Sequence, residues 1–66
     1  METATTEHSP VRSIRVRRRW SQERLAEESG LSRGLVGYVE RCPSKLTAAA
    51  AAKLAKALGV RPEDLR

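Results

Sequence analysis

The segment GLSRGLVGYVER, residues 30–41, contains two arginines and a tyrosine, and after its first residue it contains two further glycines. An α-helix turns by about 100° per residue. On such a helix one arc of about 140° holds Arg33, Gly34, Gly37, Tyr38 and Arg41. A guanidinium group donates paired hydrogen bonds to guanine or to a phosphate. A tyrosine hydroxyl donates to a phosphate, and its ring packs on a sugar or a thymine methyl group. This face therefore has the chemistry to bind a polyanion.

The two glycines of this segment are costly, because each destabilises a helix interior by about 1 kcal/mol relative to alanine. Leu35, Val36 and Val39 lie on the opposite side of the helix, so the glycines do not belong to its apolar face. We interpret the bare backbone as a place where another molecule approaches closely.

The sequence offers little for catalysis or metal binding. His8 is the only histidine and Cys42 the only cysteine, so an internal disulfide is impossible. There is no cluster of metal ligands and no glycine-rich loop to hold a phosphate. We therefore expect no enzyme activity, no cofactor, no metal and no small-molecule substrate.

The charge is basic and unevenly distributed. The 66 residues carry a formal net charge of +5, which favours nucleic acid first and an anionic membrane surface second. Residues 11–20 hold five arginines, whereas residues 21–30 hold Arg24 against three glutamates. No apolar run approaches the roughly 18 residues of a membrane span, so we expect a cytoplasmic protein associated with the nucleoid.

Start and stop signals predict an all-α domain of four to five short helices over residues 9–66, after a disordered tail over residues 1–8. Hydroxyl residues that suit N-caps are Ser9, Ser21, Ser32 and Thr47. Gly30 and Gly59 suit helix ends, and Pro43 ends the third helix. The pattern predicts helices after Ser9, from Ser21 to Gly30, over 32–41 and over Ala48–Leu58, then a short turn that holds Leu65. The expected core residues are Val11, Ile14, Leu25, Ala26, Val36, Val39, Ala48, Ala51, Leu54, Ala55 and Leu58, with Leu35 at the edge of the core.

The run SQERLAEESGLSR, residues 21–33, resembles the XRE type of helix-turn-helix proteins, the family of phage repressors and Cro. Val36, Val39 and Glu40 fit the positions that follow in this pattern. LAKALGV and PEDL, residues 54–60 and 62–65, resemble its fourth helix and the start of its fifth. The resemblance covers residues 11–65. It implies a lambda-repressor-like fold and a transcriptional regulator that binds double-stranded DNA, as a homodimer on a pseudo-palindrome.

The resemblance also suggests roles for individual residues. The third helix would enter the major groove, and the chemistry of its exposed face then assigns the base contacts to Arg33, Gly34, Gly37 and Tyr38. Phosphate contacts would come from Gln22, Ser32, Arg41, Ser44 and Lys45. The family pairs an arginine with a glutamate at the positions of Arg15 and Glu40, which would connect the first helix to the end of the third. Relatives usually have polar side chains at the two glycine positions and often have glycine where Cys42 stands.

Other functions remain open at the level of sequence. An antitoxin-type helix-turn-helix domain would bind mainly a partner protein. An RNA-binding domain is less favoured, because the chain has no exposed aromatic platform for stacking bases. The segment between Glu40 and Thr47 is also similar to that of small controller proteins of restriction–modification operons.

Overall fold

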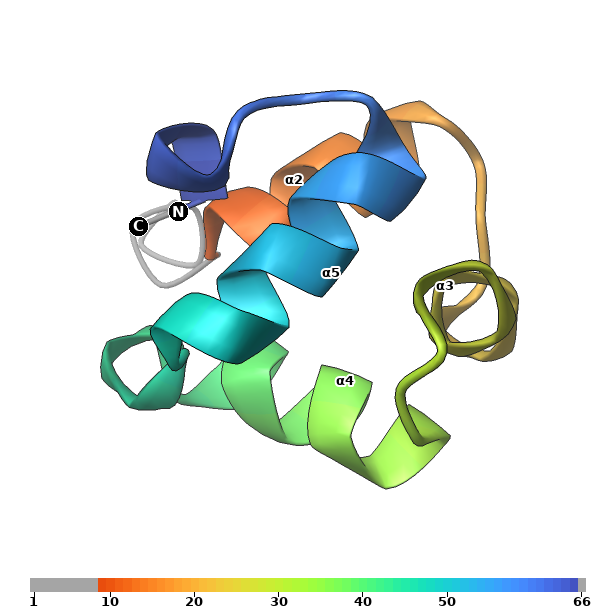
Figure 1. Ribbon diagram of the computed structural model, residues 1–66. Coiled ribbons are helices and arrows are strands. Elements are labelled where there is room, and N and C mark those ends of the chain that lie inside the picture. The colour runs from red at the N-terminus through yellow and green to blue at the C-terminus, as the bar shows by residue number, and fades with distance from the viewer. Residues whose placement is uncertain (1–8, 66) are drawn as a thin grey trace, which may run out of the picture.

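The computed structural model describes residues 9–65. Residues 1–8, where we expected a disordered tail, and Arg66 lie outside the described residues. The elements are α2 (Pro10–Arg17), α3 (Gln22–Ser29), α4 (Arg33–Arg41) and α5 (Ala48–Leu58), with 3₁₀ turns η1 (Pro43–Lys45) and η2 (Pro62–Leu65). In Figure 1, α5 crosses the centre, α4 lies below it and α3 is seen end-on at the right. The expected all-α fold is confirmed.

Each α-helix begins at a hydroxyl side chain that accepts a hydrogen bond from a backbone N–H three residues later. The four caps are Ser9, Ser21, Ser32 and Thr47, with distances of 3.0–3.1 Å. Such a cap stabilises a helix by about 1 kcal/mol. All four expected helix starts are therefore confirmed.

Apolar residues placed just before three of the caps fix how the chain enters each helix. Trp20, Leu31 and Leu46 precede the caps of α3, α4 and α5 and lie in or against the core. Five residues after each of them stand Leu25, Val36 and Ala51, all buried. These are the two positions of a hydrophobic staple. Leu46 is only 7% exposed, although it was not among the core residues expected from the sequence.

Three helices end in the same way, with a residue in the left-handed region and a backbone hydrogen bond spanning five residues. The left-handed residues are Arg19, Gly30 and Gly59, with φ of 61°, 76° and 74°. The N–H groups that follow them donate to the carbonyls of Arg15, Ala26 and Ala55. Glycine suits this conformation because it has no Cβ, so Arg19 is strained where the two glycines are not.

The core lies where α2, α3, α4 and α5 meet, and alanine and leucine dominate its α5 side. Of the expected core, Ile14 and Leu35 are only partly buried, and Leu65 is 2% exposed. The expectation for Ala48 was wrong, because it is exposed in the first turn of α5 while Ala50 is buried. Ala48 was expected to be buried because a helical periodicity of about 3.6 residues, applied along the whole of α5, places it on the same face as Ala51 and Ala55. The buried face of α5 instead begins at Ala50, and the preceding core position is taken by Leu46.

Replacing Arg19 by glycine tests the strain at the end of α2. An L-residue in the left-handed region costs about 1–2 kcal/mol. Glycine removes this cost, but part of the resulting stabilisation is offset because glycine has more conformational freedom in the unfolded chain. We therefore expect Arg19→Gly to raise the free energy of unfolding by about 0.5–1 kcal/mol, measured by urea denaturation. Arg17→Gly removes the same charge at a helical position and should instead lower stability; a loss of stability in both variants would contradict the assignment.

Candidate nucleic-acid interface

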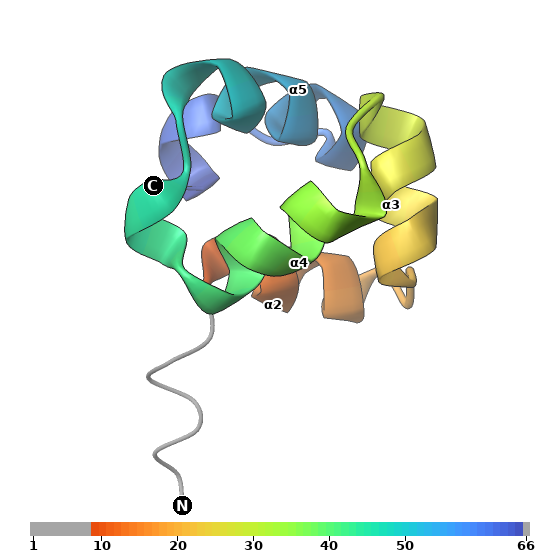
Figure 2. The same cartoon turned by 90° about the horizontal axis from the view of Figure 1, so that it is seen from below.

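The exposed face of α4 carries the residues with hydrogen-bonding side chains. Arg33, Gly34 and Arg41 are exposed, and Tyr38 retains 41% of its surface. Val36 and Val39 on the other side are buried. Figure 2 shows α4 running along one surface of the molecule, between α3 and α2, with its outer side uncovered. The short turn at Gly30 sets α4 against α3.

A buried carboxylate behind this face joins three helices. Glu40 is 4% exposed, and the Nε and Nη2 atoms of Arg15 donate to its two oxygens at 2.7 and 3.0 Å. The expected ion pair between these residues is therefore present, in bidentate form. Arg15 also donates through Nη1 to the carbonyl of Trp20 at 2.7 Å, which holds the segment between α2 and α3.

Gln22, the first residue of α3, belongs to the same network. Its Nε2 donates to Oε1 of Glu40 at 3.0 Å. From the sequence only a phosphate contact was expected for Gln22, because its hydrogen bond to Glu40 depends on how α3 meets α4. One N–H of the amide binds Glu40, which leaves a second N–H on the same nitrogen for another acceptor.

The two glycines of α4 differ in their surroundings. Apart from its two chain neighbours and the nearby backbone of α4 itself, a Cβ added at Gly34 would meet no atom of the described residues within 4 Å, so this position faces open space. Gly37 is buried, and an added Cβ would lie 3.3 Å from Nη1 of Arg41 and 3.6 Å from the amide of Gln22. The expectation that both glycines leave bare backbone on the exposed face is wrong for Gly37, because these two side chains cover it.

The residues expected to contact phosphates lie around α4. Ser32, Arg41, Ser44 and Lys45 are all exposed, and Ser44 and Lys45 belong to η1 directly after the helix. The Ser32 oxygen accepts the Leu35 N–H, so its own O–H is still available as a donor. Cys42 is a half-buried free thiol at the junction of α4 and η1.

Sequence reasoning missed the role of Arg18 and its neighbours. The guanidinium group of Arg18 donates to the Leu58 carbonyl at the end of α5. The guanidinium carbons of Arg18 and Arg24 lie 5.8 and 4.7 Å from the centroid of the Trp20 ring. Two cations thus lie near the ring of the half-buried Trp20, where α2 meets α3. Its position just before the Ser21 cap was the available signal.

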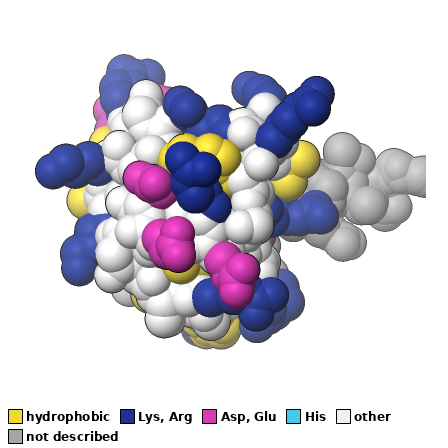
Figure 3. All heavy atoms as spheres, turned by 90° about the vertical axis from the view of Figure 1, so that its right-hand side faces the viewer, with side chains coloured by type: hydrophobic (Ala, Val, Ile, Leu, Met, Phe, Trp, Pro, Cys, Tyr) yellow, Lys and Arg dark blue, Asp and Glu magenta, His cyan; other side chains and the backbone are white. Residues whose placement is uncertain are grey.

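Charge distinguishes the faces of the molecule. Figure 3 looks onto the side formed by α3, where several acidic side chains lie near the middle beside a basic one, and further basic side chains lie around the edge. The exposed glutamates of α3 are Glu23, Glu27 and Glu28. A polyanion is repelled by such a surface, so the α4 face is the better one for it.

The part of the chain that is described shows neither a candidate metal site nor a candidate membrane-spanning helix. Residues 9–65 contain no group of three or more side chains arranged to hold a metal ion. No helix among them has the length and apolar character needed to cross a membrane.

Comparisons with known proteins agree with this architecture. A helix-turn-helix family model matches residues 11–65. The HTH-type transcriptional regulator SutR of Escherichia coli is 40% identical over 50 residues, which are 76% of this chain but 28% of that protein. The chain thus spans little more than a quarter of this curated relative.

Two solved structures are also similar. The hypothetical transcription factor NHTF from Neisseria is 41% identical with a TM-score of 0.77, over 85% of this chain and 64% of that one. The restriction–modification controller protein C.AhdI from Aeromonas hydrophila is 40% identical with a TM-score of 0.78, over 86% and 83%.

The buried carboxylate of Glu40 provides a direct test of the network behind the α4 face. Glu40→Gln keeps the shape but removes the charge that Arg15 faces, and leaving a buried charge without its partner costs several kcal/mol. We expect a loss of about 2–4 kcal/mol in the free energy of unfolding, measured by chemical denaturation. Glu28→Gln, in the exposed pair with Arg24, is the control and should cost less than about 0.5 kcal/mol; equal losses would contradict a special role for Glu40.

Proposed function

The chain belongs to the helix-turn-helix family, and on that premise we propose that it is a sequence-specific regulator of transcription that binds double-stranded DNA. One observation carries the proposal most directly. The second helix of the motif, α4, exposes Arg33, Gly34, Tyr38 and Arg41, while its apolar side is buried and Glu40 is held by two other helices. A rigid helix with such a face fits the major groove.

We assign the base contacts mainly to the first residues of α4. Arg33 is its first residue, and the N-terminal part of a recognition helix is the part that meets base edges. Its guanidinium group suits the O6 and N7 atoms of a guanine. Tyr38 lies further along the helix, where its ring packs on a sugar or a thymine methyl group. Gly34 lets the backbone approach the bases; we do not extend this role to Gly37, whose backbone is covered.

Phosphate contacts fix the orientation of the helix without reading sequence. We assign these contacts to residues on both sides of α4: Gln22, Ser32, Arg41, Ser44 and Lys45. Gln22 is well placed because Glu40 holds its Nε2 while the amides at the start of α3 also favour an anion.

We further propose that two copies bind a pseudo-palindromic site with half-sites about 10 base pairs apart. Binding of this kind alters transcription by occluding or recruiting other proteins and makes or breaks no bond, so we propose no catalytic activity. Its place of action would be the cytoplasm, at the nucleoid.

Arg33 supplies the first test of this proposal. The preferred sequence is selected from a random duplex library with the unaltered protein, and affinities for it and for a scrambled duplex are measured by fluorescence anisotropy. Loss of one bidentate base contact costs about 1–3 kcal/mol. We therefore expect Arg33→Ala to reduce the preference for the selected duplex by about 5–150-fold.

The control is Arg61→Ala, which removes an equal charge beside η2. Figure 1 shows η2 at the upper left of the molecule, away from α4 at the bottom. An unchanged preference in the Arg33 variant would contradict the assignment of α4 to the major groove. Tight binding that appeared only with a protein partner would favour an antitoxin-type module instead.

The glycines of α4 supply a second test. Gly34→Ala places a methyl group in open space, so it should raise the free energy of unfolding by a few tenths to about 1 kcal/mol. If DNA lies against this backbone, affinity for the selected duplex should fall by about tenfold or more. Gly37→Ala is the comparison, because its methyl group lies against the side chains of Gln22 and Arg41, which we assign to phosphates. Any loss of affinity that it causes should therefore be the same for the selected and the scrambled duplex. Full DNA affinity in Gly34→Ala would rule out close approach at that position.

A further inference from the structure

We propose that α2 adds a phosphate contact to the DNA-binding surface, made by Arg12. This inference rests on the proposed function and extends its surface beyond the helix-turn-helix pair. From the sequence, Arg12 is only one of the five arginines of residues 11–20 and has no individual role.

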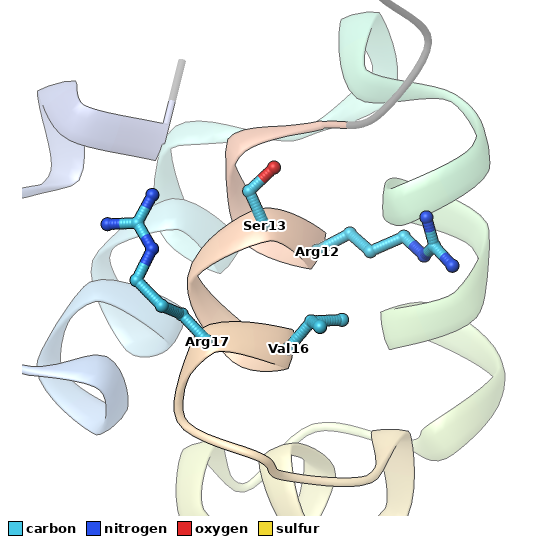
Figure 4. A pocket seen from close by; sticks show the side chains of 4 residues that line it. All are labelled: Arg12, Ser13, Val16 and Arg17. Carbon is cyan, nitrogen blue, oxygen red and sulfur yellow. The ribbon is translucent and has the colours of Figure 1, made fainter. Parts of the chain in front are cut away.

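A shallow groove of about 380 Å³ runs along the outer side of α2, lined by Arg12, Ser13, Val16 and Arg17. Figure 4 shows its two arginines pointing in opposite directions. Arg12 extends from the helix toward α4, whereas Arg17 points toward the side of α5 and η2. Arg17 also lines a second groove with Val60 and Asp64, which confirms its direction.

Arg12 lies on the side of α2 that faces the proposed DNA surface. Arg15, three residues later, binds Glu40 of α4, and that carboxylate also accepts from Gln22 of α3. Residues three apart on a helix are neighbours, separated by about 60° and 4.5 Å of rise. Arg17 is rotated from Arg15 by about 160°. Since Arg15 faces α4, Arg12 lies on the side of α2 near α4 and Arg17 lies on the opposite side.

The charge at this position fits a phosphate. Of the described residues, the side chains that line the groove include two arginines and no acidic residue. Among residues 9–65, the ion pairs involve Arg15, Arg24 and Arg61 but not Arg12. Arg15 is itself neutralised by Glu40, so Arg12 carries the net positive charge on this side of α2. A guanidinium group there binds a phosphate through paired hydrogen bonds.

The apolar part of the groove is consistent with a sugar-phosphate backbone. Val16 follows Arg12 by one turn and is 52% exposed, more than any other large hydrophobic side chain of residues 9–65. One apolar side chain beside a cation is too small for a protein interface, which needs about 800 Å² from each partner. It is sufficient to pack on one deoxyribose next to the phosphate.

The test compares two arginines on opposite rims of one groove. Affinities of the unaltered protein, Arg12→Ala and Arg17→Ala are measured over a range of salt concentrations, with the selected duplex and with a scrambled one. Each phosphate contact contributes about 0.9 to the slope of log affinity against log salt. We expect Arg12→Ala to reduce this slope by about 0.9 and to weaken both duplexes by the same factor.

Arg17→Ala should leave the slope unchanged, because salt near 0.1 M screens a charge that lies more than about 10 Å from the phosphates. Arg12→Lys should restore part of the slope, and thermal unfolding checks that each variant is folded. The inference would be overturned if Arg12→Ala and Arg17→Ala reduced the salt slope equally, or if Arg12→Ala did not reduce it at all. It would also be overturned if Arg12→Ala weakened binding to the selected duplex alone, because that result indicates base reading. If the unaltered protein binds no duplex, the proposed function itself fails.

Discussion

The carboxylate of Glu40 is the constraint on which the arrangement of the helices depends. Its side chain is 2% exposed, and a buried charge is tolerated only when it is paired and hydrogen-bonded. The partners come from α2, through Arg15, and from the start of α3, through Gln22. Any rotation or slide of α4 would break these bonds and leave a charge unpaired. The network therefore fixes the direction of α4, and with it the side chains that face outward.

The rest of the domain relies on local devices because its core is small. There is no phenylalanine, and the α5 side of the core is built from alanine and leucine. Four hydroxyl caps, three apolar residues placed before them and three left-handed helix ends define each helix locally. A domain of this size buries only about 60% of its unfolded surface, so every such contribution matters. Arg19 is the one strained residue among the three left-handed helix ends, since glycine would adopt its conformation without strain.

The two glycines of α4 show how one residue type serves two purposes in one helix. Gly37 makes room within the protein, because Gln22 and Arg41 lie over it. Gly34 leaves bare backbone at the surface. The proposed reader of DNA therefore presents few side chains to the bases, chiefly Arg33 and Tyr38, and surrounds them with phosphate contacts. On this view sequence preference comes from a few contacts, and much of the affinity comes from charge.

The sequence alone determined the elements and the family. Caps, terminators and apolar spacing are local signals, and they located all four α-helices and the turn that holds Leu65. The pair formed by Arg15 and Glu40 was expected from the family resemblance instead. The features that were not predicted from the sequence depend on contacts between residues in different helices. The burial of Gly37, the tie between Gln22 and Glu40, and the exposure of Ala48 follow from how one helix meets another. A helical wheel gives the angle of a residue but not what stands opposite it. Only the tertiary structure decided which of two glycines, and which of two arginines on α2, faces the proposed DNA surface.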